Sequence, residues 1–176
     1  DVVQDIYATS THNHLLFFTD KGRVYRLKGY QIPEGSRQAR GTAIINILDI
    51  NIDEQITAVI PIENFEDNNY LFMVTKNGIV KKTSLEEYNT NYTGLIALSL
   101  DNDDQLIDVK LTDSKQDIIL GTKNGLSIRF FEEDVRSMGR TARGVKGIDL
   151  EDNDQVIGMD VVDDDKDLLV ITDRGY

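Results

Sequence analysis

The fold is decided by a short stretch near the start of the chain, residues 15–28, which read LLFFTDKGRVYRLK. An apolar run enters a polar Thr-x-x-Gly turn at residues 19–22, and a second extended segment leaves it. Polar residues ending in glycine are the usual signal for a β-hairpin, because glycine accepts the positive φ angle that such a turn requires. This stretch therefore predicts two antiparallel strands joined by a tight turn.

The same turn recurs along the chain. Three further Thr-x-x-Gly segments begin at Thr75, Thr122 and Thr172, and the four turn glycines follow one another after 56, 47 and 50 residues. A second landmark keeps a stricter spacing: Gln55, Gln105 and Gln155 lie 50 residues apart, each after acidic residues and before an apolar run. Two landmarks that share one period indicate an internal repeat.

Each repeat contains enough apolar segments for four strands. The hairpin supplies two, a third apolar stretch follows at residues 42–48, 95–100 and 145–150, and a fourth begins at each of the spaced glutamines. Four strands in about 50 residues are typical of a propeller blade. We therefore predict an all-β, propeller-like domain of four-stranded blades, with a β-sandwich as the alternative.

The repeats occupy the whole chain as one domain, residues 1–176. Repeat 1 is expected at about 12–62, repeat 2 at about 68–112, repeat 3 at about 115–162, and a partial repeat 4 at about 166–176. A blade that stops after its first hairpin leaves open strand edges, and the chain does not begin with methionine. We therefore expect residues 1–176 to be a fragment of a longer protein.

Composition excludes several classes of protein. The chain has no cysteine, so disulfides and thiolate metal sites are excluded, which fits a cytoplasmic location. No apolar run approaches the roughly 18–20 residues of a membrane span. The net charge of −12 argues against nucleic acid when it is taken as an average.

The charge, however, is sorted by position within the repeat. Residues 19–42 carry a net charge of +4 and residues 122–147 one of +3, whereas residues 43–67 hold six acids and no base and residues 148–167 carry −8. Equivalent positions of successive repeats fall on equivalent places of the surface, so the bases should form one belt and the acids another. Clustered bases indicate nucleic-acid binding even in an acidic chain.

One basic position recurs in every full repeat. The residue four positions after the turn glycine is Arg26, Lys82 or Arg129. These residues form either a row of phosphate contacts or a solvated strand face whose cations discourage edge pairing. We favour the phosphate contacts.

Residues 15–30 and the segment MGRTARGVKG at residues 138–147 resemble the C-terminal domain of the A subunit of DNA gyrase. The paralogous A subunit of topoisomerase IV is similar but fits less well. The resemblance implies a β-pinwheel, a propeller-like disc whose blades exchange strands. It also implies a basic rim that wraps double-stranded DNA, in an enzyme that introduces negative supercoils with ATP hydrolysis.

The family's signature Gln-Arg-Arg-Gly-Gly-Lys-Gly has no intact copy here. Residues 143–147 echo it with one change and residues 38–41 do so more faintly. Together with the recurring basic position and its neighbours, these copies define the residues that we expect to contact DNA: Arg23, Arg26, Lys28, Arg37, Arg40, Lys81, Lys82, Arg129, Arg140, Arg143 and Lys146.

No chemistry is expected within the chain itself. Residues 139–144 have the glycine spacing of a P-loop but lack the following Lys-Ser/Thr, and the acidic turns lack the glycine of a calcium loop. We therefore expect no catalytic, cofactor-binding or metal-binding residues, and expect Tyr25, Tyr30 and Tyr70 to pack between strands.

The resemblance also bears on partners and location. It places ATP and Mg²⁺ on other domains of the enzyme. It implies the other domains of the gyrase A subunit, together with the gyrase B subunit, as partners in the bacterial cytoplasm, at the nucleoid. The alternative function is a propeller-like module that binds a protein partner through its acidic belt.

Overall fold

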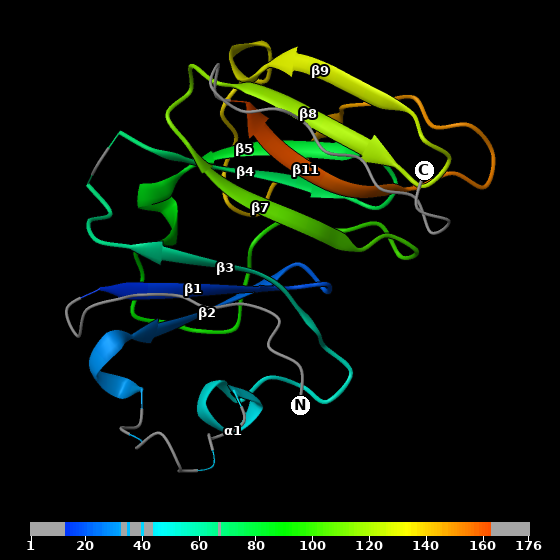
Figure 1. The fold of residues 1–176 in the computed structure, drawn as a ribbon. Helices are drawn as coiled ribbons and strands as arrows, with labels where there is room; N and C mark the ends of the chain where they lie inside the picture. Colours follow the sequence, from blue (N-terminus) through cyan, green and yellow to red (C-terminus); the bar gives the residue numbers. More distant parts are fainter. Residues whose placement is uncertain (1–12, 33–34, 36–39, 41–43, 67, 163–176) are drawn as a thin grey trace.

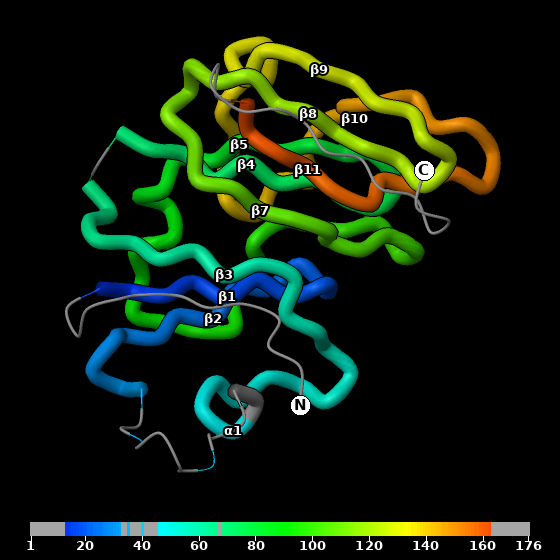
Figure 2. Tube along the Cα trace, in the orientation of Figure 1, coloured from blue at the N-terminus to red at the C-terminus, as the bar shows by residue number. Residues whose placement is uncertain are grey.

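The computed structural model describes residues 13–32, 35, 40, 44–66 and 68–162. Within these residues the chain forms antiparallel sheets that follow one another through the molecule, with one short α-helix and three short 3₁₀ turns (Figure 1). The colour gradient of Figure 2 shows the sheets arranged in chain order, from blue through green to orange. The all-β, propeller-like prediction is confirmed.

Three sheets share one strand order. The first is β3-β1-β2-β6, the second β7-β4-β5-β10 and the third β11-β8-β9. Their strands, sheet by sheet, are β1 (His14–Thr19), β2 (Arg23–Lys28), β3 (Ile56–Ile62) and β6 (Leu95–Ile96); β4 (Tyr70–Thr75), β5 (Ile79–Ser84), β7 (Leu106–Thr112) and β10 (Val145–Lys146); β8 (Asp117–Thr122), β9 (Ser127–Phe131) and β11 (Val156–Val162).

The blades exchange strands. β6 belongs to the second repeat by sequence but pairs with β2 of the first, and β10 of the third repeat pairs with β5 of the second. Each of the first two sheets is thus completed by the repeat that follows it. This is the arrangement that the resemblance to the β-pinwheel implied.

The spaced glutamines occupy equivalent environments, as predicted. Each offers its backbone carbonyl oxygen to the second residue of its own repeat's turn, through N–H donors at Asp20 (2.9 Å), Lys76 (2.8 Å) and Lys123 (2.9 Å). The three turn glycines within the described residues adopt positive φ angles, +74° at Gly22 and +88° at both Gly78 and Gly125. The 50-residue period therefore reflects one hydrogen-bonded corner built three times.

The corners also connect neighbouring blades. The carbonyl oxygen of Asp20 accepts the N–H of Leu106 at 3.0 Å, and that of Lys76 accepts the N–H of Val156 at 2.9 Å. The fourth strands of the three repeats lie against one another, with β7 between β3 and β11. These strands form the inner side of the array, and the hairpin strands β2, β5 and β9 lie toward the outer side.

The hydrophobic core lies between the sheets. Side chains alternate along each strand, so Leu16 and Phe18 enter the layer shared with the second sheet, whereas Leu15 and Phe17 face the other side. In the second sheet Phe72 and Val74 pack toward the third. The second sheet is therefore covered on both faces.

The third stretch of repeat 1 differs from the predicted strand. Helix α1 (Ile44–Leu48) stands in its place, and Leu48 and Ile50 pack against the free face of the first sheet. In repeats 2 and 3 the third stretch pairs with the preceding repeat's hairpin, but over only two residues each. Among the described residues no earlier hairpin offers residues 44–48 a partner, so helical hydrogen bonds satisfy this backbone instead. The predicted fourth hairpin lies outside the described residues.

Candidate nucleic-acid interface

Most of the predicted DNA-binding residues that the structure describes lie on the hairpin strands toward the outer side of the sheets. Within the described part of the chain they occupy β2, β5, β9, β10 and the segment that leads into β10, together with Arg40. Arg37 lies outside the described residues. The three repeats use the same strand positions very differently.

In the first repeat the basic side chains are accessible. Arg23 is exposed and its Nη1 donates to the carbonyl oxygen of Gly94 at 3.0 Å, whereas Lys28 is half-buried and Arg40 is exposed. No carboxylate forms an ion pair with these three residues within the described part of the chain. Their charge is therefore available to an external anion.

Arg26 anchors the adjoining loop. Its Nη1 donates to the carbonyl oxygen of Thr90 at 2.7 Å, its Nε donates to Nδ1 of His14 at 3.2 Å, and its guanidinium lies 4.8 Å from the ring centroid of Phe65. Burial and then the charge of Arg26 lower the pKa of His14, which favours the neutral imidazole that can accept this bond. Arg26 thus holds the loop of the next repeat against β2 while keeping its positive charge.

In the second repeat the two predicted lysines are buried, which argues against the expected phosphate contacts. Lys81 is 0 % exposed, and its Nζ donates to the carbonyl oxygens of Ala97 (2.6 Å) and Arg140. Burial lowers its pKa to about 7. Lys82 is 4 % exposed, and its Nζ donates to Oγ of Ser114 (3.1 Å) and to the carbonyl oxygen of Glu132 (3.3 Å). Both side chains serve the contact between blades.

In the third repeat the cations are accessible but paired with acids. Arg129 lies 2.6 Å from Asp117, Arg143 lies 2.7 Å from Asp101, and Lys146 lies 3.0 Å from Asp149. Arg140 is half-buried, and its Nη1 donates to the carbonyl oxygen of Ile96 at 2.5 Å. The predicted basic and acidic belts therefore touch in this part of the molecule.

The degenerate signature at residues 143–147 owes its glycines to packing. Gly144 has a φ angle of +99°, and a Cβ there would lie 2.5 Å from the carbonyl oxygen of Val80. A Cβ at Gly147 would lie 2.5 Å from Cγ1 of Val80. The two glycines let the segment lie flat against β5, so that Arg143 and Lys146 between and beside them face solvent.

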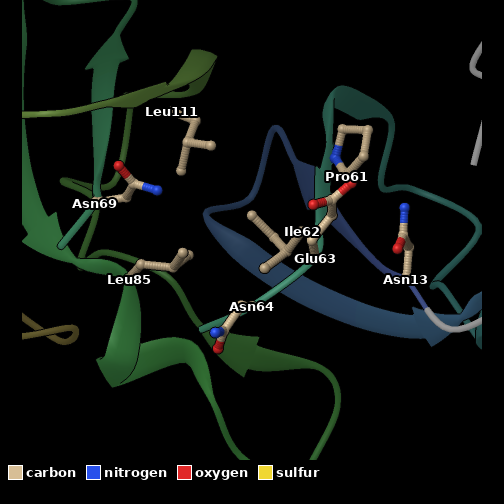
Figure 3. A pocket seen from close by; sticks show the side chains of 8 residues that line it. All are labelled: Asn13, Pro61, Ile62, Glu63, Asn64, Asn69, Leu85 and Leu111. Atoms are coloured by element: carbon tan, nitrogen blue, oxygen red, sulfur yellow. The ribbon is translucent and has the colours of Figure 1, made fainter. Parts of the chain in front are cut away.

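One hollow lies away from the basic residues, at the junction of the first two sheets (Figure 3). It measures about 340 Å³, and its walls include Pro61, Ile62 and Glu63 on one side and Leu85 and Leu111 on the other. Glu63 is the one charged residue among those that line it. A negative hollow repels phosphate, so we assign it no part in the interface.

The tyrosines near the first sheet differ in burial, which the sequence did not predict. Tyr25 is 5 % exposed and donates to Glu54, as a packed residue should, but Tyr30 is 64 % exposed and lies beside the basic edge with Tyr92, which is 78 % exposed. The prediction that Tyr30 packs between strands is therefore wrong. It follows β2 directly in the 3₁₀ turn η1 (Gly29–Gln31), where the chain leaves the sheet.

The described residues contain no group of three or more His, Asp or Glu placed to hold a metal ion. They also contain no helix that is long and apolar enough to cross a membrane.

Fold and surface together define a strand-exchanged, propeller-like repeat domain whose unpaired, accessible cations lie on the outer edge of the first repeat. The profile of the family described as the DNA gyrase C-terminal domain, beta-propeller, matches residues 13–63, 69–113 and 116–163. The chain belongs to this family.

Relatives in sequence support this family assignment. The chain is 52 % identical over 149 residues to the DNA gyrase A subunit of Halalkalibacterium halodurans, covering 84 % of this chain and 18 % of that protein. It is 47 % identical over 180 residues to the DNA gyrase A subunit of Staphylococcus epidermidis, covering 100 % of this chain and 20 % of that protein. The chain thus spans about a fifth of these relatives.

Two solved structures share the fold. The C-terminal domain of a DNA topoisomerase IV superposes with a TM-score of 0.82 at 38 % identity, covering 87 % of this chain and 48 % of that one. A DNA gyrase A C-terminal domain superposes with a TM-score of 0.72 at 21 % identity, covering 88 % and 49 %. The sequence relatives thus carry the gyrase name, while topoisomerase IV is also a close structural neighbour.

Proposed function

We propose that this chain is a non-catalytic part of the gyrase A subunit that binds double-stranded DNA along its outer edge. The observation that carries the proposal is the first repeat, where Arg23, Lys28 and Arg40 have no carboxylate partner among the described residues. Unpaired cations on one edge attract phosphates and release counterions when they bind. A row of such contacts positions a duplex without reading its sequence.

The proposed role in the enzyme follows from the family. Blades of a propeller-type fold are arranged radially, so a duplex that follows their outer edge must bend. The bending energy of about 1–6 kcal/mol has to be offset by contacts along the arc. In the whole protein this bend would support wrapping and negative supercoiling. ATP and Mg²⁺ would bind other domains, with the gyrase B subunit serving as a partner in the bacterial cytoplasm.

The alternative, protein binding through the acidic belt, has less support. Asp101 and Asp149 already engage Arg143 and Lys146 of the same chain. Part of the acidic belt is therefore neutralised from within.

Salt dependence of duplex binding tests the proposal. We expect the triple variant Arg23→Ser, Lys28→Ser and Arg40→Ser to flatten the plot of log affinity against log salt by about 2.7, or roughly 0.9 per phosphate contact. The matched control removes three lysines that are not among the proposed contacts, Lys110→Ser, Lys115→Ser and Lys123→Ser. If both triples flatten the plot equally, only net charge matters and the proposed edge is not the binding surface.

A further inference from the structure

A hollow of about 290 Å³ lies on the outer edge of the first sheet. One wall is formed by β2 and η1, and the other by the loop of the second repeat at residues 90–93. Two cations (Arg26 and Lys28), two tyrosines (Tyr30 and Tyr92) and four amide or hydroxyl side chains line it, with no acid among these residues.

The walls are held in place by hydrogen bonds. The backbone N–H of Arg26 donates to Oγ1 of Thr93 at 3.2 Å, and its Nη1 donates to the carbonyl oxygen of Thr90 at 2.7 Å. Tyr92 is fixed in turn, because its N–H donates to Oγ1 of Thr90 at 3.0 Å. On the opposite wall the N–H of Lys28 donates to Oε1 of Gln31 at 2.8 Å. The hollow is therefore formed before any ligand arrives.

Its charge selects an anion. Arg26 keeps its positive charge while its Nε donates to His14 and its Nη1 donates to Thr90. The Lys28 ammonium lies 5.7 Å from the ring centroid of Tyr30. No acid on the walls competes for these cations. A phosphate entering the hollow would therefore meet two positive charges and no repulsion.

Its rings select a flat partner. Tyr30 and Tyr92 are 64 % and 78 % exposed, so both offer open aromatic surface beside the cations. Stacking of a nucleobase on an aromatic side chain needs a base that is free of its own duplex, because paired bases already stack on their neighbours. The volume lies near the lower limit of about 300 Å³ for ligand pockets, which suits a single monomer.

We propose that this hollow binds one unpaired nucleotide of single-stranded DNA, with its phosphate at Arg26 and Lys28 and its base against Tyr30 or Tyr92. This activity goes beyond duplex binding, although the shared cations mean that it uses the same edge as the proposed function. A duplex presents only phosphates here and leaves both tyrosines without a partner.

Fluorescence anisotropy with a short labelled oligothymidine strand and a labelled duplex tests the proposal on the whole chain. We expect Tyr30→Ser and Tyr92→Ser together to weaken binding of the single strand about 5- to 150-fold, which corresponds to about 1–3 kcal/mol per stacked base. Duplex binding should change by less than about twofold, because substitutions of exposed residues that make no contact usually have small effects. Phe131→Ser, at an aromatic residue that is 63 % exposed on β9, is the matched control and should leave both affinities unchanged.

The other outcomes overturn the proposal in distinguishable ways. If the double variant binds the single strand as wild type does, the tyrosines do not hold a base, while duplex binding still stands. If strand and duplex weaken equally, the hollow contacts the duplex and has no preference for unpaired DNA. If wild type binds neither, the hollow has no DNA ligand and the proposed function fails with it. Thermal unfolding midpoints confirm that each variant remains folded.

Discussion

The hairpins of the second and third repeats have similar sequences and opposite surroundings. The position four residues after the turn glycine is Lys82 in one and Arg129 in the other, yet Lys82 is 4 % exposed and the Arg129 side chain 55 %. The difference comes from the following repeat. Glu132 of the third repeat, together with Ser114 just before that repeat, covers Lys82. Among the described residues no strand pairs with the outer edge of β9. The role of a side chain in this fold is therefore set by the repeat that follows it.

The largest expected difference between the two positions is the loss of stability when each side chain is removed. We expect Lys82→Ala to lower the free energy of unfolding by about 2–5 kcal/mol, because a long buried side chain is lost together with its hydrogen bonds. Arg129→Ala loses only an exposed ion pair with Asp117 and should cost about 0.2–1 kcal/mol. Urea unfolding of the two variants measures both values. Equal losses would mean that covering by the next repeat does not decide the role of this position.

The turn glycines give a second contrast. Gly78→Ala and Gly125→Ala both place a side chain at a φ angle of +88°, which costs each about 1–2 kcal/mol. At Gly78 the new Cβ would also lie 2.8 Å from Cγ2 of Ile148, whereas none of the described atoms lies within 4 Å of it at Gly125.

We therefore expect Gly78→Ala to be the more destabilising of the two by about 1–3 kcal/mol, the usual cost of overpacking. The difference in urea midpoint at constant slope checks this. A Gly125→Ala variant that is as unstable as Gly78→Ala would break the comparison.

The pH dependence of stability gives a third comparison between the second and third repeats, at Lys81. The equivalent residue of the third repeat is Ile128, which cannot titrate. Burial lowers the pKa of Lys81 from 10.5 to about 7 in the folded chain, so between these values the unfolded state holds a proton that the folded state has lost. Stability should therefore rise from about pH 7 toward pH 10.5, by up to about 1.4 kcal/mol per pH unit.

Lys81→Ile, which copies the third repeat, should remove this contribution. The charged groups that act on Lys81 are Glu87 and Arg140, and both remain in the variant. Urea midpoints measured across this pH range provide the test. The same rise in the variant would assign the pH dependence to another group.

The sequence was sufficient for the features that a repeat determines by itself. The turn glycines and the spaced glutamines predicted the corners, because each corner closes through hydrogen bonds within its own repeat. The count of four residues from each turn glycine also placed Arg26, Lys82 and Arg129 on equivalent strand positions. It could not predict which of them is covered, because the covering residues come from elsewhere in the chain.

The sequence could not predict helix α1 or the hollow on the outer edge of the first sheet, and the reason is the same for both. The stretch at residues 42–48 has the apolar character of a strand, but a strand needs a partner, and none is present among the described residues. The hollow joins residues 26–31 to residues 90–93, which are far apart in the sequence. Only the exchange of β6 into the first sheet brings them together.

That exchange has a consequence for the chain as it is made. A ribosome adds about 5–20 residues per second, and the first hairpin is free to form as soon as it emerges. Its outer edge stays open until Ile96 follows, because β6 is the strand that covers it. The nascent protein therefore carries one open β-edge from repeat to repeat, and a pause in translation between two repeats leaves that edge free to pair with another chain.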